Sequence, residues 1–206
     1  WFFADQAWRV YAATARAAQA LSGRCADGKV QVTGCPATLP SRTPPSVYSD
    51  LGIDRRRRLL LAMGGSLGAA AIDRLVWEMI EAAEQSRDKR WKELAVVHVI
   101  GRRAQAPEVP STPNRNHAIT YRPVDYLQDV PSVLAAAGFY LGRSGAATVG
   151  EITAAGLPAL LIPDPQHSDK QQLANAEELE RIGLGTILDQ DTAQGRDVLD
   201  WLARSW

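Results

Sequence analysis

Cysteine is scarce in this sequence, and its absences set the first limits on function. Cys25 and Cys35 are too few for a disulfide framework, which favours a reducing compartment. They lack a C-x-x-C spacing and the three histidines are scattered, so no metal site is predicted. No apolar run approaches the ~20 residues that span a bilayer. The 23 basic and 23 acidic residues cancel, which argues against a nucleic-acid binder whose affinity comes from bulk charge.

What the sequence does contain is a regular alternation of apolar runs and helical patterns. Hydrophobic residues make up 46% of the 206 residues, enough for a substantial core. From Leu51 onward, short apolar runs alternate with amphipathic segments of ~10 residues, which is typical of a parallel α/β sheet. The expected strands are 59–63, 95–100, 118–121, 139–142, 159–162 and 185–188. The first expected helix is indicated by the helical spacing of Ile72, Leu75, Val76, Met79 and Ala83. The other expected helices cover 130–137, 148–155, 171–182 and 198–203.

The first part of the chain has a different organisation. Residues 9–14, 15–21 and 29–33 predict one strand-helix-strand unit, which is too small to bury its own core. Glycine and proline then mark a linker or hinge within 34–45. Because the chain begins at Trp1 without an initiator methionine, we expect it to be part of a longer protein.

The segment 144–151 (Ser-Gly-Ala-Ala-Thr-Val-Gly-Glu) is the most informative motif. An apolar strand leads into a loop without bulky side chains, and a helix starts at once, so free backbone N–H groups can bind an anion. Glu151 lies one turn into the helix, where its carboxylate can accept two hydroxyl hydrogen bonds. Amides beside a hydroxyl-binding carboxylate predict a nucleotide site. Alternatively, Glu151 is a first-turn acid that complements the helix dipole.

A second small-residue loop, Gly64-Gly65-Ser66-Leu67-Gly68, also follows a strand and opens a helix. It matches neither G-x-G-x-x-G nor a P-loop, and alone it fits a plain tight turn equally well. Ligands in open α/β sheets bind beyond the carboxyl ends of the strands. Two such loops at that edge therefore indicate one shared ligand.

A third polar segment, 166–175, runs into a helix. Gln171, Gln172 and Asn175 offer amides suited to sugar hydroxyls, although a solvated helix start has the same composition. His167 is a candidate base, whereas His98 lies on an expected core strand and is interpreted as structural. The basic run 55–58 is interpreted as a solvated charged segment rather than a phosphate or membrane patch.

Together these blocks, with Ala154-Ala155-Gly156-Leu157-Pro158 and the Val30 to Pro36 segment, resemble the MurG family of UDP-N-acetylglucosamine transferases. That family makes lipid II in peptidoglycan synthesis during cell growth and division. The resemblance covers the carboxyl-terminal, donor-binding half. It implies a GT-B architecture, in which this half is an α/β Rossmann-like parallel sheet with helices on both faces. It divides the chain into the end of an acceptor domain (1–36), a linker (37–49) and a UDP-sugar donor domain (50–206).

The resemblance also implies roles for individual residues. Ser66 would contact the donor, the Leu127 backbone the uracil, Glu151 the ribose, and the Gln171 and Gln172 amides the sugar. The full donor set is Ser66, Leu127, Ala146, Ala147, Thr148, Val149, Gly150, Glu151, Gln171, Gln172 and Asn175. No cofactor and no metal are implied. The implied partners are UDP-GlcNAc, a lipid-linked acceptor through an amino-terminal domain, and the inner membrane surface, with no nucleic acid. The full-length protein would be cytoplasmic and peripheral to the cell membrane.

Two departures from the family pattern limit this interpretation. The family places a diphosphate-directed arginine shortly after the linker proline, where this chain has Thr38, and Arg42 is the nearest substitute. The family's amino-terminal G-G-T-G-G-H loop is absent from these residues, so the chain alone should bind donor but hardly turn over.

Two alternatives stay open. The chain could be a non-catalytic nucleotide-sugar binding subunit completed by a partner, or a transferase for another UDP-sugar. A dinucleotide-binding oxidoreductase is a weaker third alternative, because Ile100-Gly101-Arg102 lacks the acid expected after the second strand.

Overall fold

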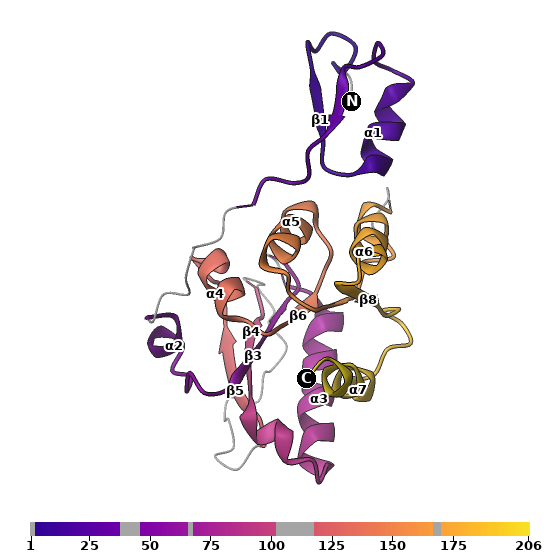
Figure 1. Cartoon of the computed structure of the whole chain (residues 1–206). Coiled ribbons are helices and arrows are strands. Elements are labelled where there is room, and N and C mark those ends of the chain that lie inside the picture. Colours follow the sequence, from indigo (N-terminus) through magenta and orange to yellow (C-terminus); the bar gives the residue numbers. More distant parts are fainter. Residues whose placement is uncertain (1–2, 38–45, 66–67, 102–117, 167–169) are drawn as a thin grey trace.

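The computed structural model describes residues 3–37, 46–65, 68–101, 118–166 and 170–206 (Figure 1). Its main body is one six-stranded parallel sheet in the order β5-β4-β3-β6-β7-β8. The chain starts at the centre, builds outward to β5, then returns to the other side of β3. This reversal between β3 and β6 is the topological switch point, where ligands bind in doubly wound sheets. The strands are β3 (Arg58–Met63), β4 (Leu94–Val99), β5 (Thr120–Val124), β6 (Phe139–Gly142), β7 (Ala159–Leu161) and β8 (Gly185–Ile187).

Helices cover both faces of the sheet because its strands are apolar on both sides. In β3, Leu60 and Ala62 pack with α3 (Ala70–Gln85) and α7 (Gly195–Ser205), and the intervening Leu59 and Leu61 face the opposite layer. The opposite layer consists of α2 (Ser46–Asp50), α4 (Val130–Ala136), α5 (Ala146–Ala155) and α6 (Gln171–Arg181). The predicted fold class, a Rossmann-like parallel sheet with helices on both faces, is confirmed.

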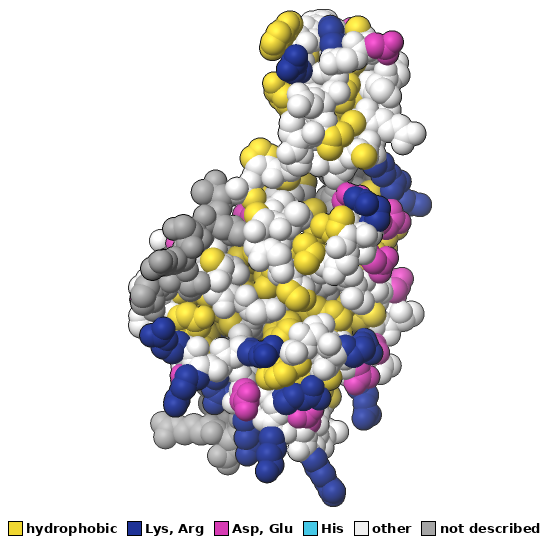
Figure 2. Space-filling model, in the orientation of Figure 1, with side chains coloured by type: hydrophobic (Ala, Val, Ile, Leu, Met, Phe, Trp, Pro, Cys, Tyr) yellow, Lys and Arg dark blue, Asp and Glu magenta, His cyan; other side chains and the backbone are white. Residues whose placement is uncertain are grey.

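A small unit precedes the sheet, as the sequence predicts. β1 (Val10–Ala12) pairs in parallel with β2 (Val30–Val32), and α1 (Ala15–Ser22) connects them. Thr14 caps α1 by accepting the Ala17 N–H at 3.1 Å. The unit leaves large hydrophobic side chains exposed, with Trp8 83% exposed, and Figure 2 shows hydrophobic groups on its surface.

Contacts between described residues join this unit to the sheet domain at α5 and at α6, and Figure 1 shows the unit beyond these two helices. Arg16 of α1 forms an exposed ion pair with Glu177 of α6 at 3.0 Å. Cys35, which follows β2, lies so close to α5 that a Cβ on Gly150 would be 2.8 Å from its own Cβ. Glycine at position 150 is therefore required by the close approach of two chain segments.

Several boundaries differ from the sequence predictions. β5 begins and ends later than the expected strand 118–121, and it includes Pro123, which is tolerated because β5 is an edge strand where a missing donor does little harm. α2 lies across the end of the predicted linker, held by buried Val47. The expected surface loop at 102–116 lies outside the described residues. Within the described ranges, no helix is long and apolar enough to cross a bilayer.

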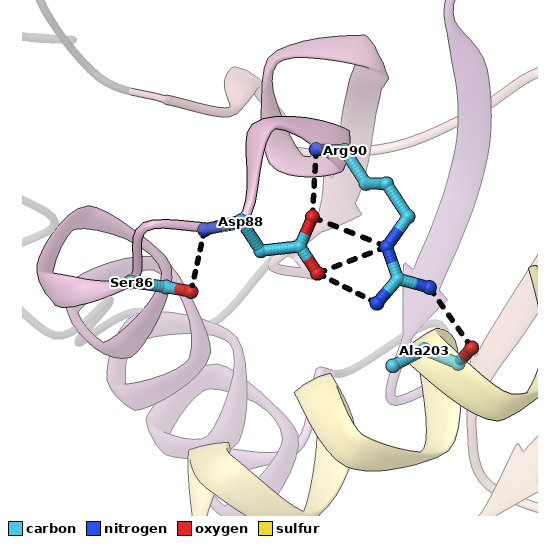
Figure 3. A network of polar contacts seen from close by, with 4 residues as sticks. All are labelled: Ser86, Asp88, Arg90 and Ala203. Carbon is cyan, nitrogen blue, oxygen red and sulfur yellow. Dashed lines mark hydrogen bonds and ion pairs between the residues drawn. The ribbon is translucent and has the colours of Figure 1, made fainter.

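An unpredicted 3-10 helix, η1 (Lys89–Glu93), is held by a polar network (Figure 3). The Asp88 carboxylate accepts from the Arg90 backbone at 2.9 Å and from its guanidinium at 2.6 Å. Arg90 also donates to the Ala203 carbonyl of α7 at 3.1 Å. The network lowers the pKa of Asp88, chiefly through the hydrogen bond from Arg90. It fastens the start of β4 to the last helix.

Candidate donor site

The loops that follow β3 and β6 meet at the switch point. After β3, Gly65 (φ 93°) and Gly68 (φ 76°) adopt left-handed conformations, and the Gly68 N–H donates to the Gly65 carbonyl at 3.0 Å. A Cβ on Gly64 would lie 2.4 Å from the Ala69 nitrogen, so the strand end is packed tightly against the start of α3. The predicted donor contact Ser66 lies outside the described residues.

The loop after β6 is fastened to the start of α6. The Ser144 side chain is fully buried and donates to the Gln172 carbonyl at 2.6 Å. In return, the Asn175 amide donates to the Ser144 carbonyl at 2.9 Å. These bonds bring together residues that are about 30 positions apart and hold the start of α5 beside the start of α6.

The first turn of α5 provides backbone donors. Gly145 is the N-cap residue, and no side chain among the described residues caps this end. The N–H groups of the first turn have no partner within the helix, and the helix dipole adds positive potential there. Ala146 and Ala147 are exposed and small, which lets a ligand reach these donors. The turn is suited to a phosphate group.

Glu151 lies one turn further along α5 and is half-buried. Burial raises the pKa of its carboxyl group. Burial also raises the pKa of the neighbouring Tyr140 phenol, and the negative charge of Glu151 raises it further. Among the described residues, none donates a hydrogen bond to the Glu151 carboxylate and none forms an ion pair with it. Its oxygens are available to accept from ligand hydroxyls.

The predicted sugar-side residues have unequal surroundings. Gln171 is exposed, whereas Gln172 is half-buried and its side-chain oxygen accepts the Asp164 N–H at 3.0 Å. No acceptor among the described residues takes a hydrogen bond from the Gln172 amino group. Asn175 is 8% exposed with its amide on Ser144, so it tethers the loop. Leu127 packs its side chain in the core, and the residue is 8% exposed.

Arg143 is a site element that the sequence reasoning did not single out. Its half-buried guanidinium donates to the Ile162 carbonyl at 2.7 Å and to the Gln190 side chain at 2.6 Å. Burial lowers its pKa, and Asp164 opposes that shift. Arg143 therefore braces the ends of β6, β7 and β8 and places a positive charge at this edge. Its position directly before the Ser-Gly loop was the available signal.

A pocket of about 390 Å³ adjoins this edge at the ends of β7 and β8. Its lining includes Asp164, which is hydrogen-bonded to Gln172, and Gln190, which is hydrogen-bonded to Arg143. Lys170 and Leu173 also line it. Separately, the described part of the chain holds no group of three or more His, Cys, Asp or Glu side chains that could bind a metal ion.

Residues 59–204 match the glycosyltransferase family 28 C-terminal domain. The chain belongs to this family. Its resemblance to the carboxyl-terminal half of MurG is confirmed by named relatives. UDP-N-acetylglucosamine--N-acetylmuramyl-(pentapeptide) pyrophosphoryl-undecaprenol N-acetylglucosamine transferase from Lacticaseibacillus casei is 33% identical over 165 residues, covering 79% of this chain and 43% of the relative. The enzyme of the same name from Corynebacterium diphtheriae is 35% identical over 144 residues, covering 70% and 36%.

Solved structures share the fold. MurG from Acinetobacter baumannii aligns with a TM-score of 0.65 and 24% identity, over 97% of this chain and 52% of that one. The kitacinnamycin glycotransferase aligns with a TM-score of 0.66 and 17% identity, over 97% and 47%. The chain spans less than half the length of the two named relatives.

Proposed function

We propose that this chain is the donor-binding half of an inverting glycosyltransferase that transfers GlcNAc from UDP-GlcNAc to a lipid-linked muramoyl-pentapeptide acceptor. The observation that carries the proposal is the half-buried Glu151 carboxylate, free of described partners, one turn beyond the uncapped first turn of α5. Amides for a diphosphate and a carboxylate for ribose hydroxyls lie on one helix. The names of the relatives supply the sugar and the acceptor class.

The chemistry is a single displacement at the anomeric carbon. The acceptor hydroxyl oxygen forms a bond to that carbon as the bond to the UDP oxygen breaks, and UDP leaves with the electron pair. The first-turn amides of α5 stabilise the charge that develops on the diphosphate. The hydroxyl proton passes to a base outside this donor half. Acceptor positioning and that base come from an amino-terminal domain with a glycine-rich loop and a histidine, working at the cytoplasmic face of the membrane.

Titration calorimetry tests the donor assignment. The purified chain should bind UDP and UDP-GlcNAc, bind UDP-glucose more weakly, and show no heat with NAD. Preference for another UDP-sugar would redirect the donor assignment. Binding of NAD alone would replace it with a dinucleotide enzyme.

A transfer assay with radiolabelled UDP-GlcNAc and a lipid I analogue tests the division of labour. The 206-residue chain should transfer negligibly, and fusion to an acceptor domain should give multiple turnovers because the acceptor and its base are then positioned. Robust turnover by the chain alone would place the catalytic machinery within it. Donor binding without turnover in any fusion would support a non-catalytic binding subunit.

A further inference from the structure

Three buried polar side chains are linked by hydrogen bonds in a row beside the glycine turn that follows β3. His98 of β4 is fully buried, with Nε2 3.1 Å from the Asp73 carboxylate of α3 and Nδ1 3.0 Å from the Tyr121 hydroxyl of β5. Asp73 is 2% exposed and Tyr121 5% exposed. The donor site described above uses none of the three directly.

The chemistry of the groups fixes the direction of the hydrogen bonds. An ionised carboxylate only accepts, so His98 donates from Nε2 to Asp73. Nδ1 then accepts from the Tyr121 hydroxyl, which leaves every ring nitrogen satisfied. Burial raises the pKa of Tyr121, and the Asp73 charge raises it further, so the phenol keeps the proton it donates.

The chain of bonds ends at the first turn of α3. The Asp73 N–H donates to the Ala69 carbonyl at 3.0 Å, and Ala69 is the residue against which Gly64 packs. His98 lies in register with Ala62, one residue before the end of β3. The bonds therefore set the height of the α3 N-terminus above β3 and β4.

Stability alone does not explain these buried polar side chains, because apolar residues of similar volume often stabilise a core at least as well. The hydrogen bonds between them fix one arrangement of α3 against the sheet, since a shifted helix would leave a buried polar group without its partner. At this place, the arrangement they fix is the turn of Gly65 and Gly68.

We propose that Tyr121, His98 and Asp73 form a positioning relay that holds the α3 N-terminus, together with the flanking Gly65 and Gly68, in the geometry that receives the nucleotide. The inference rests on the proposed donor function. The three residues act through α3 and do not touch the substrate. The relay acts through hydrogen-bond geometry, so an uncharged acceptor at position 73 preserves it.

The test compares UDP affinity with thermal stability in matched variants of the 206-residue chain. Asp73→Leu removes the acceptor and should weaken UDP binding about tenfold or more. Asp73→Asn keeps an acceptor oxygen and should restore affinity to within about threefold of the native chain. Tyr121→Phe removes only the far end and should have a smaller effect. The control is Leu75→Ala, a fully buried position on the same helix, which lowers stability without breaking the relay.

Two outcomes overturn the relay. One is loss of affinity in Asp73→Leu and Leu75→Ala in proportion to their loss of melting temperature. The other is failure of Asp73→Asn to recover affinity. Amide resonances of Gly65 and Gly68 give a readout without ligand: they should shift in Asp73→Leu and stay near native positions in Asp73→Asn. If the native chain binds no UDP, the donor assignment fails, while these resonances still decide the relay.

Discussion

Asn175 and Ser144 are joined by a buried hydrogen bond, in which the Asn175 amide donates to the Ser144 carbonyl across 2.9 Å and 31 residues of sequence. The Ser144 hydroxyl in turn donates to the backbone carbonyl of Gln172 at the start of α6. The two bonds make the end of β6 and the start of α6 one rigid piece. The proposed nucleotide side and sugar side of the site are therefore held at a fixed separation.

Replacing Asn175 by Asp should show how much this tether contributes. The substitution keeps the shape and removes the donor, so two oxygens face each other in a buried place. The free energy of unfolding should fall by about 1–3 kcal/mol or more. Chemical denaturation of the variant measures it, with the exposed Glu180→Ala on the same helix as control. Equal stability of both variants would mean that the tether is relaxed in solution.

Removal of the Glu151 carboxylate should weaken UDP binding. Loss of hydrogen bonds from ribose hydroxyls to a charged acceptor should cost roughly 1.5–3 kcal/mol, or about 10- to 150-fold in dissociation constant. Titration calorimetry of Glu151→Ala against the native chain measures this. Thr153→Ala, two residues along α5, is the control. Unchanged affinity in Glu151→Ala would remove Glu151 from the ribose site.

The pH dependence of binding should carry the signature of Glu151. Because burial raises its pKa in the folded chain, the charged acceptor is lost on acidification before an ordinary glutamate would be protonated. UDP affinity should fall as the pH drops through that raised pKa. Protonation removes a buried charge, so the Glu151 contribution to stability is fully present below its ordinary pKa of 4.5 and is lost as the pH rises through the raised value.

The comparison for this pH effect is Glu151→Gln, measured over the same pH range. The terminal phosphate of the ligand also titrates near pH 6 or so, and the Gln variant shares that component. Identical pH profiles for the native and Gln chains would assign the whole dependence to the ligand.

Gln172 should separate sugar recognition from nucleotide recognition. Its oxygen is used by the Asp164 N–H, and its amino group remains as the donor for a sugar hydroxyl. In Gln172→Ala, affinity for UDP-GlcNAc should fall while affinity for UDP stays nearly unchanged. Glu180→Ala, at an exposed position further along the same helix, is the control. Equal weakening of both ligands would show that Gln172 acts by supporting the Asp164 loop.

Gly150 and Cys35 should behave as a coupled pair. Gly150→Ala places a methyl group 2.8 Å from the Cys35 Cβ, and such overpacking should cost about 1–3 kcal/mol of stability. With Cys35→Gly added, the same substitution should cost less, because the contacts with the Cys35 side chain are removed and alanine favours helix, while the Cys35 carbonyl oxygen remains 3.1 Å from the new Cβ. Thermal unfolding of the four chains of this double-mutant cycle measures the coupling. Additive effects would mean that α5 and the Cys35 segment separate in solution.

The elements that could be predicted from sequence are those with a strong local pattern. β3 and β6 are apolar on both faces and end at glycine-rich loops, so their existence and the edge they share followed directly. η1 could not be predicted, because a five-residue helix has no periodicity and depends on Asp88, Arg90 and the distant Ala203 carbonyl.

Within the site, local patterns indicated which segments matter but not which groups are free. Gln172 and Asn175 look alike in a sequence, and only the fold reveals that Ser144 occupies the Asn175 amide. His98 was interpreted as structural, and it is buried as expected. Its partners Asp73 and Tyr121 lie 25 and 23 residues away and carry no shared motif.

The switch point that creates the site also determines the order in which the sheet can form. β3 is central, but its second neighbour β6, in which Phe139 pairs with Leu60, comes only after α3, η1, β4, β5 and α4 in the sequence. During synthesis, one side of β3 therefore stays unpaired until β6 emerges. Parallel pairings between distant segments form slowly and expose apolar edges meanwhile. The arrangement that brings the loops after β3 and β6 together thus leaves one edge of β3 open to wrong pairing while the chain is being made.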